Sequence, residues 1–430
     1  MILKLKKQIK KIPFVFSKLK KFQNLFLTKK YSRIQKKYKA LLLSKIFKVK
    51  SQSITKVAFF VTQKQLWNLQ SVYDAFDREE FFEVFIVVFP NEENKIDTLD
   101  FTLEENYVFF KEKAMNVIYG YDQKLKKYLN KEQIDADIIF YDQPYPGIDK
   151  KLSFENTCKS SLICYVPYGY KVAKAYEEHF NMPLHNICWK VFAESDWHKN
   201  QFIKLGKTKG KNVVTSGYPK FDIYGEPVSL KNDIWKPNDS KFKKIIWAPH
   251  WSITHTNYST FDKNYKFFQK MAIENPNISW IFKPHQRLRY FLEEIQFMSK
   301  KDIDEYYDFW NSLPNTKFYN EGDYFDIFKT SDALITDCGS FLAEYLPSKK
   351  PIMLLVNEKS AGYNEIGEKI VDSYYKAYKN DDIINFIENV VIKENDHLEK
   401  ERLLNLNLIQ PNGDGAGKFI VNYIKNELAP

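Results

Sequence analysis

The chain has 430 residues, a formal net charge of +11, 44% hydrophobic residues and 17% aromatic residues. This length suits two or three domains, and the composition is sufficient for a sizeable core. No apolar run reaches the roughly 18 residues of a membrane-spanning helix, and the N-terminus shows no secretory signal peptide. The four cysteines show no CxxC pair and no metal-ligand spacing, so we expect free thiols in a reducing cytosol and no bound metal.

Residues 1–50 form a basic segment unlike the rest of the chain. It contains 16 lysines and one arginine but no acidic residue, a charge of +17, so residues 51–430 carry −6. Pro13 should break or kink a helix here. Apolar residues with helical spacing recur among the lysines at Leu5, Ile9, Ile12 and Phe16.

Such a basic amphipathic helical segment is typical of proteins that bind an anionic membrane surface. We therefore expect peripheral binding to the cytoplasmic face of the cell membrane, and no nucleic acid as a partner. A nucleic-acid-binding arm and a disordered tail are the alternatives.

Strands and helices alternate after this segment. The first predicted unit is a strand at 56–61, a helix around 65–77 and a strand at 84–89. Further strands are predicted at 137–141, 162–166, 190–193 and 213–215, with helices around 123–131 and 197–205. This alternation indicates a parallel sheet covered on both faces, so residues 51–225 are predicted to form a Rossmann-like domain.

The alternation lapses around 224–241, where prolines and polar residues predict a linker. It resumes with predicted strands at 244–248, 278–282, 316–319, 332–337 and 351–356. Residues 242–410 are thus predicted to form a second Rossmann-like domain, and residues 411–430 a helix that crosses back to the first. Two such domains form the α/β arrangement called GT-B, whose cleft is the expected active site.

Basic residues and histidines directly follow two predicted strands of the second domain. His250 follows strand 244–248, whereas Lys283, His285 and Arg287 follow strand 278–282. In an open parallel sheet both turns face the same crevice. Lysine and arginine can neutralise a pyrophosphate there, and a histidine can hold a phosphate oxygen or move a proton.

The stretch 331–356 has the pattern of strand, sharp turn, helix and strand. Asp337 ends the first strand, and Gly339 and Ser340 open the helix. Free N–H groups at such a helix start, together with a serine hydroxyl, can bind a phosphate. An ordinary βαβ unit with Ser340 as the N-cap is the alternative.

Several segments resemble motifs of the CDP-glycerol glycerophosphotransferase family of teichoic acid and capsule synthesis. They are IIWAPH, FKPH, SDALITDxxSxxxEY, KKPIMLL, TSGYPKFD at 215–222 and DGxGKFIVNYI at 414–424. The resemblance runs from about residue 160 to residue 426. It implies a GT-B fold, peripheral membrane binding, and CDP-glycerol as donor substrate without a bound metal cofactor.

The same resemblance implies a donor phosphate site. Lys283 and His285 match the family's K-P-H turn, whose histidine contacts the pyrophosphate, and Arg287 lies beside it. The family's D-Y-S-S turn is matched by Asp337, Gly339 and Ser340. Gly339 stands where the family has its first serine, so a backbone N–H would have to replace that hydroxyl.

The first domain departs from the family pattern at one turn. The family has an H-G-T-P turn whose histidine is the proposed general base, but Tyr168 and Gly169 stand at its first two positions here. Gly169 is then on the acceptor side. A tyrosine with a pKa near 10 is a poor base at pH 7. Either a neighbour activates Tyr168, or His250 is the base, or the chemistry differs.

The sequence thus predicts a transferase that moves glycerol phosphate, or a related polyol phosphate, from CDP-glycerol to a lipid-linked or surface-glycan acceptor and releases CMP. A GT-B glycosyltransferase that uses a nucleotide sugar for capsule or O-antigen synthesis is the alternative, because it needs the same diphosphate site. A catalytically inactive membrane-bound scaffold is a third possibility, and the missing histidine is its support.

Overall fold

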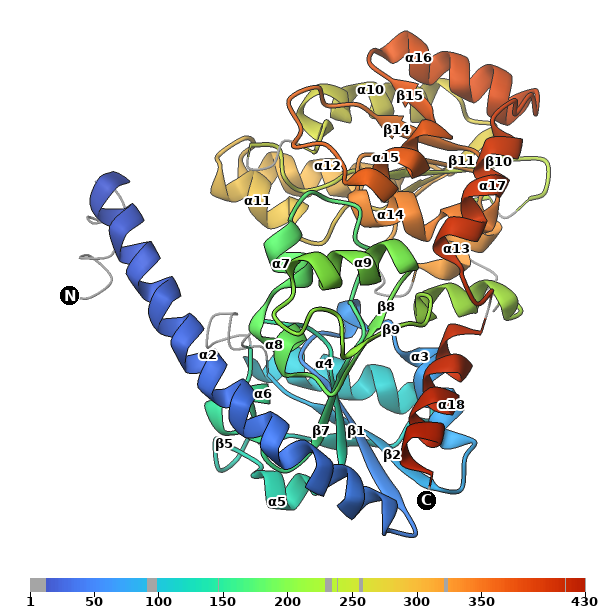
Figure 1. The fold of residues 1–430 in the computed structure, drawn as a ribbon. Helices are drawn as coiled ribbons and strands as arrows, with labels where there is room; N and C mark the ends of the chain where they lie inside the picture. The colour runs from blue at the N-terminus through green and yellow to red at the C-terminus, as the bar shows by residue number, and fades with distance from the viewer. Residues whose placement is uncertain are drawn as a thin grey trace.

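The computed structural model describes the backbone of residues 13–90, 99–145, 147–228, 234–237, 239–254, 258–320, 324–413 and 415–429; the side chains of residues 13–30 and 99–102 lie outside the described part. Two α/β domains are stacked, the first below the second in Figure 1. Each is built on its own parallel sheet, as the alternating pattern predicted.

The first domain contains a seven-stranded sheet in the order β3-β2-β1-β6-β7-β8-β9. Its strands are β1 (Thr55–Val61), β2 (Phe82–Val88), β3 (Val117–Tyr119), β6 (Ile138–Tyr141), β7 (Leu162–Tyr165), β8 (Lys190–Ala193) and β9 (Val213–Thr215). The helices between them are α3 (Gln70–Asp77), α4 (Leu99–Glu112), α5 (Lys131–Ile134), α6 (Phe154–Thr157), α7 (Tyr176–Phe180), α8 (Pro183–Ile187) and α9 (Asp196–Leu205).

The second domain contains a six-stranded sheet in the order β12-β11-β10-β13-β14-β15. Its strands are β10 (Lys243–Ala248), β11 (Ile278–Phe282), β12 (Thr316–Phe318), β13 (Ala333–Thr336), β14 (Ile352–Leu355) and β15 (Tyr375–Ala377). The helices are α10 (Phe261–Glu274), α11 (Leu288–Glu294), α12 (Lys300–Ser312), α13 (Phe325–Thr330), α14 (Gly339–Glu344), α15 (Glu365–Asp372), α16 (Asn380–Asn385), a π-helix at Phe386–Ile392 and α17 (Glu399–Ile409).

Both sheets follow the Rossmann strand order, in which the first strand lies centrally and the fourth pairs with its other side. β1 pairs with β2 and β6, and β10 pairs with β11 and β13, all in parallel. Strands are added on one side of the first strand up to the third strand, and from the fourth strand onward on its other side. Ligands of open α/β sheets bind at this switch point, outside the carboxyl ends of the strands. In the second domain the histidine turns fall there.

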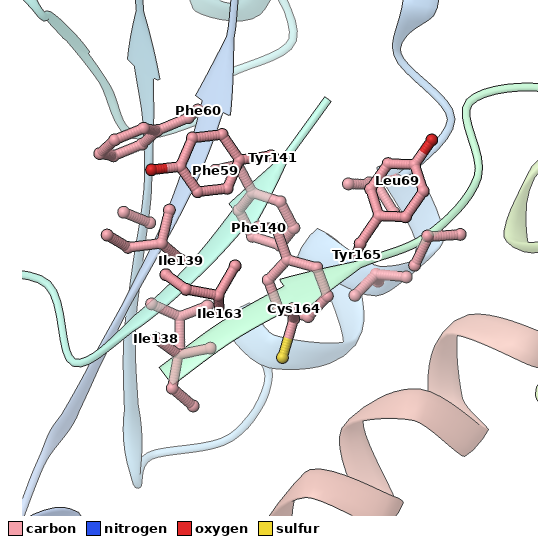
Figure 2. Packing of buried hydrophobic residues seen from close by; sticks show 14 of the residues in the cluster. Phe59, Phe60, Leu69, Ile138, Ile139, Phe140, Tyr141, Ile163, Cys164 and Tyr165 are labelled. Carbon is pink, nitrogen blue, oxygen red and sulfur yellow. The ribbon is translucent and has the colours of Figure 1, made fainter. Parts of the chain in front are cut away.

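The core of the first domain explains why its strands are almost entirely apolar. Every residue of β6 and β7 is buried, because helices cover both faces of the parallel sheet. Figure 2 shows the aromatic and aliphatic side chains of three neighbouring strands in contact. Phe59 of β1 stacks on Phe140 of β6 with ring centroids 5.0 Å apart.

The sequence-based predictions were wrong for one hairpin and missed two short strands. The helix expected around 123–131 is instead a hairpin of β4 (Tyr121–Asp122) and β5 (Lys127–Tyr128), with Lys126 at the positive φ of 47°. The edge strands β3 and β15, each of three residues, were not predicted. A strand of three residues carries little periodic pattern, although β9 and β12 have the same length and were predicted.

The long helix α2 (Pro13–Lys50) lies along the side of the first domain (Figure 1). It begins at Pro13, a favourable first helical position, and residues 1–12 with their predicted spacing lie outside the described residues. One side of its C-terminal part is buried: Tyr38, Lys45 and Val49 are 4%, 6% and 2% exposed. The Lys45 ammonium donates to the Cys158 carbonyl at 2.5 Å.

The expected division at residue 50 therefore needs correction, because the second half of α2 is part of the first domain. Gln35 also donates to the Asn186 carbonyl at 3.1 Å. Burial lowers the pKa of Lys45 to about 8. A charge count places all of this segment outside the folded body, because it does not reveal which side of a helix faces a core.

The last helix, α18 (Ala416–Leu428), packs against α3 of the first domain. The Asp222 carboxylate accepts hydrogen bonds from the backbone N–H groups of Ala416 at 3.0 Å and Gly417 at 2.8 Å. A Cβ added to Gly417 would lie 2.5 Å from the backbone carbonyl carbon of Ser71, so only glycine fits at this contact. The motif at 215–222 and the start of α18 thus join the last helix to the first domain.

Candidate active site

The candidate site lies at the C-terminal edge of the second sheet. The turns after β10, β11 and β13 meet there because these strands are adjacent and parallel. The His285 N–H donates to the Pro249 carbonyl at 2.9 Å, and the His250 N–H donates to the Asp337 carboxylate at 2.5 Å. The structure therefore brings the two histidine turns and the turn that begins α14 to one edge, as the motif positions predicted.

The two histidines form a pair, with ring centroids 5.2 Å apart. In each ring Nδ1 accepts a hydrogen bond from the backbone N–H two residues further on: Ser252 donates to His250 and Arg287 donates to His285, both at 3.1 Å. A neutral imidazole has one donor and one acceptor nitrogen. These backbone donors favour the tautomer that carries the proton on Nε2 in both rings, which makes each Nε2 a hydrogen-bond donor. The Ser252 hydroxyl lies 2.9 Å from His250 Nδ1 and can donate to it as well.

The surroundings keep both rings neutral. Burial, assisted by the positive charge of Arg287, lowers the pKa of His250 to about 4. Burial lowers the pKa of His285 well below its ordinary value, and His250, Arg287 and Lys283 add to this effect. At neutral pH the pair therefore presents two uncharged N–H donors.

Two cations lie beside the histidine pair on aromatic faces. The guanidinium carbon of Arg287 lies 4.2 Å from the centroid of the Trp251 ring. The Lys283 ammonium lies 5.9 Å from the Tyr319 ring and 5.7 Å from the Tyr324 ring. Cation–π contacts of this kind position the charges at the edge of the sheet. The sequence did not indicate Trp251, although it directly follows His250.

Asp337 has a different environment from the one expected of a phosphate ligand. Its Oδ1 accepts from the His250 N–H, and its Oδ2 accepts from the Thr260 N–H at 2.5 Å and the Thr260 hydroxyl at 2.8 Å. The residue is 1% exposed, and burial raises the pKa of Asp337 to about 7. Its carboxylate is thus used to position the His250 turn, and these three hydrogen bonds leave it little capacity for direct contact with a phosphate.

The first domain repeats this arrangement at the equivalent place, which the sequence did not reveal. Asp142, directly after β6, accepts from the Thr62 N–H at 2.6 Å and the Thr62 hydroxyl at 2.8 Å, directly after β1. Burial raises the pKa of Asp142 to about 6. The sequence does show an aspartate directly after the fourth strand of both domains, and this shared position could have indicated the repeated arrangement.

The turn after β13 leads into α14 without a side-chain cap. Cys338 is the N-cap residue and makes no capping hydrogen bond. Ser340 is the second helical residue, so its hydroxyl does not cap the helix, and its Oγ lies 3.8 Å from the Cys338 sulfur. A Cβ added to Gly339 would lie 3.5 Å from the Val172 side chain of the first domain. The start of α14 therefore faces the other domain.

The turn after β7 belongs to the first domain and contains Tyr168 and Gly169. Burial raises the pKa of Tyr168, although a hydrogen bond from Tyr145 partly opposes the rise. The phenolate form of Tyr168, which is the form that can take a proton, is thus less populated at neutral pH than that of an exposed tyrosine. A Cβ added to Gly169 would meet no atom within 4 Å, so this position borders open space.

A hollow of about 120 Å³ adjoins this turn. Asn68 lines it, and its amide donates to the Pro167 carbonyl at 2.6 Å. Aromatic and polar side chains from both domains contribute to its walls: Lys64, Trp67, Gln70, Asp74, Phe109, Lys220, Glu226 and Phe325.

A buried ion pair joins the first domain to the second domain beside this hollow. Lys220 lies 3.5 Å from the Glu344 carboxylate, with side chains 12% and 2% exposed, and donates to the Tyr324 hydroxyl at 2.5 Å. Both residues occur in the motifs quoted above, at TSGYPKFD and SxxxEY. Within the described residues, no group of three His, Cys, Asp or Glu side chains is placed to hold a metal.

Comparison with solved structures shows which fold this is. The wall teichoic acid polymerase TagF superposes with a TM-score of 0.59 at 12% identity, over 96% of each chain. The MnaA–UDP structure from S. aureus gives 0.55 at 14% identity, over 87% of this chain and 97% of that one. UDP-GlcNAc 2-epimerase from Neisseria meningitidis, bound to UDP-GlcNAc, gives 0.53 at 13% identity, over 86% and 99%. These similarities confirm the GT-B fold class.

Comparison of the sequence with family patterns identifies the family. The pattern of CDP-glycerol:poly(glycerophosphate) glycerophosphotransferases matches residues 172–407. This range contains both histidine turns and the start of α14, and it begins just after the Tyr168 turn, where the chain departs from the family. None of the curated proteins compared matches the chain. More than half of the chain fits one pattern, so this protein belongs to the CDP-glycerol:poly(glycerophosphate) glycerophosphotransferase family.

Proposed function

We propose that the protein transfers glycerol phosphate, or a related polyol phosphate, from CDP-glycerol to a lipid-linked or surface-glycan acceptor and releases CMP. The observation that carries this proposal is the pair of neutral histidines. His250 and His285 present two Nε2–H donors beside two cations at the C-terminal edge of a Rossmann sheet. Such an edge is where diphosphates bind in open α/β folds.

In the proposed reaction an acceptor hydroxyl attacks the phosphorus nearest the glycerol, and CMP leaves with the bonding electrons. Negative charge spreads over the phosphate oxygens as the bond to CMP breaks. The two imidazole N–H groups, Lys283 and Arg287 would stabilise that charge, and the start of α14 at Gly339 and Ser340 would add backbone donors. Preorganised donors in a partly buried site cost no reorganisation at the moment of reaction.

His250 acts in this scheme as a donor to phosphate and not as the general base. Its Nδ1 lone pair accepts from the Ser252 N–H, and its Nε2 already carries a proton. Neither nitrogen is free to take a proton from the acceptor. Tyr168 is also disfavoured, because burial raises its pKa.

The test is CMP release by the purified full chain. CDP-glycerol, CDP-ribitol and UDP-sugars are offered separately with a lipid-linked glycan acceptor. CMP from a CDP-polyol supports the proposal, whereas UDP release from a UDP-sugar supports the glycosyltransferase alternative, and no turnover of any donor supports the scaffold. His285→Ala should lower CMP release about a hundredfold, the usual effect of losing one preorganised donor. His397→Ala, at an exposed site, is the matched control.

Peripheral attachment to the cytoplasmic face of the cell membrane is the second part of the proposal. Lys36, Leu43 and Phe47 lie on one face of α2 by helical periodicity. Leu43 and Phe47 expose 78% and 75% of their surface, and Lys36 and Lys37 are also exposed. Exposed apolar side chains among lysines fit an anionic lipid surface. In the described part of the chain, no helix has the length and apolar character needed to cross a bilayer.

Cosedimentation with vesicles tests the membrane proposal. Leu43→Ser combined with Phe47→Ser should reduce binding to anionic vesicles, and high salt should reduce binding of the native chain. Leu404→Ser, at a residue 63% exposed on α17, is the control. Equal binding of the double variant and the native chain would contradict the role of this face.

A further inference from the structure

The turn after β7 contains a lysine with unusual surroundings. Lys171 is 8% exposed, and its ammonium lies 3.6 Å from the centroid of the Tyr168 ring. Among the described residues, no side chain or carbonyl accepts a hydrogen bond from this ammonium. In the H-G-T-P pattern Lys171 stands at the position of the proline, three residues after the position of the missing histidine. The amine therefore sits over the side chain that replaces that histidine.

The backbone at this position is fixed from both domains. The Lys171 carbonyl accepts from Nε2 of His198, on α9 of the first domain, at 3.0 Å. It also accepts from the side-chain amide of Asn364, in the second domain, at 2.8 Å. One residue further, the Val172 carbonyl accepts from the Asn364 N–H at 2.8 Å. Lys171 therefore lies where the two domains meet, next to the start of α14.

The groups around the amine are mostly acidic or aromatic. Glu194, directly after β8, is 0% exposed, and neither of its carboxylate oxygens has a hydrogen-bond partner. Burial lowers the pKa of Lys171, and the charges of Glu194, Tyr145 and Glu344 oppose this effect. The other titratable groups near it are Tyr168, His179, His185 and His198.

We propose that Lys171 is the catalytic base on the acceptor side, in place of the missing histidine. This inference rests on the proposed transfer from CDP-glycerol. The acceptor O–H bond breaks and its proton moves to the uncharged form of the Lys171 amine, which becomes an ammonium. The acceptor oxygen forms the new bond to phosphorus, and the bond from phosphorus to CMP breaks. Burial without a hydrogen-bond partner gives a lysine this capacity.

Lys171 fits this role better than its neighbours. Glu194 is entirely enclosed, so no acceptor hydroxyl reaches it in this arrangement. The lone pair of His250 Nδ1 is occupied. The new ammonium would be stabilised by the Tyr168 ring, 3.6 Å away, and by the charge of Glu194, which gives the unpaired carboxylate a function.

Two measurements test this proposal on the full chain. The first is the pKa of Lys171, followed by NMR of ¹³C-methylated lysines and assigned with Lys171→Arg. It should lie below the pKa of Lys174, an exposed lysine on the same segment. Equal pKa values for Lys171 and Lys174 would overturn the proposal without reference to any substrate.

The second measurement is CMP release with CDP-glycerol. Lys171→Met should lower turnover about 10²- to 10⁴-fold, the range for a positioned base. Lys171→Arg should be as inactive, because a guanidinium keeps the charge but takes no proton. Lys171→His should recover part of the activity, with the acid limb of its pH profile near 6.5. Affinity for CDP-glycerol should stay unchanged in all three, and Lys174→Met should remain fully active.

The outcomes separate this role from others. Full activity in Lys171→Arg would show that Lys171 contributes only its positive charge. Weaker CDP-glycerol binding in Lys171→Met would show that Lys171 contacts the donor phosphate. Either result overturns the proposal. A native protein that releases no CMP from any CDP-polyol refutes the proposed transfer itself, whereas an active native protein with an active Lys171→Met variant refutes only the role of Lys171.

Discussion

Replacing Asp337 by Ala removes the acceptor that fixes the His250 turn. The carboxylate accepts from the backbone N–H groups of His250 and Thr260, both at 2.5 Å, and from the Thr260 hydroxyl at 2.8 Å. The hydroxyl can rotate to another acceptor, but the backbone groups cannot. A buried N–H without an acceptor costs about 1–3 kcal/mol, so two of them should cost about 4 kcal/mol locally.

Hydrogen exchange of the native state, followed by mass spectrometry, measures this loss directly. A local loss of about 4 kcal/mol corresponds to roughly a thousandfold faster exchange of the amides around His250 and Thr260. Exchange is preferable to a global unfolding curve, because a chain of two domains does not unfold in one two-state step. CMP release should fall as well, because His250 would lose its orientation.

Asp142→Ala is the matched control for this experiment. Asp142 holds Thr62 in the first domain by the same contacts, so its replacement should speed exchange near Thr62 and leave the His250 turn unchanged. Unchanged protection of His250 and Thr260 in a folded Asp337→Ala protein would refute the reasoning. Loss of protection in both domains alike would show general destabilisation instead of the local role inferred here.

Gly417→Ala should lower the melting temperature, because its Cβ would lie 2.5 Å from the Ser71 backbone and overpacking of this kind costs about 1–3 kcal/mol. Gly415→Ala, whose Cβ meets only the Asn412 carbonyl at 3.5 Å, should leave the melting temperature nearly unchanged. The neutral His250 ring, with a pKa of about 4 in the fold against about 6.5 unfolded, contributes stability that is fully present above pH 6.5 and lost as the pH falls to 4, about 3 kcal/mol in all. In urea titrations at several pH values, the stability of His250→Gln should therefore depend less on pH than that of the native chain. The same pH dependence in both proteins would contradict the neutral state of His250. Deleting residues 1–50 should lower the melting temperature, because Tyr38 and its buried neighbours on α2 are lost, whereas deleting residues 1–30 keeps those contacts.

The order of strands and helices could be predicted from the sequence because strands buried on both faces must be apolar along their whole length. That apolar pattern predicted β1, β10 and the strands that pair with them. It failed at the hairpin β4–β5, whose strands have two residues each, and at the three-residue edge strands β3 and β15, each of which pairs with one neighbouring strand. It also placed α2 outside the fold, because composition does not report which residues of a helix find a core.

The position of the candidate site was likewise determined by the sequence, because parallel strands carry the residues that follow them to one edge. His250, His285 and Ser340 could be placed there from motif positions alone. Their chemical states depend on the tertiary structure. Backbone N–H groups decide which imidazole nitrogen carries the proton, and burial decides that both rings are neutral.

Tertiary structure also shows that Asp337 holds the His250 turn in place. A carboxylate that accepts three hydrogen bonds within the protein has little capacity left for a substrate. Only the tertiary structure places the Lys171 amine over the Tyr168 ring where the two domains meet, a position that no sequence motif indicated. The sequence by itself therefore determined which elements form and which edge of the sheet carries the histidines. Hydrogen-bond partners and solvent exclusion, which exist only in the folded chain, decided what each side chain can do.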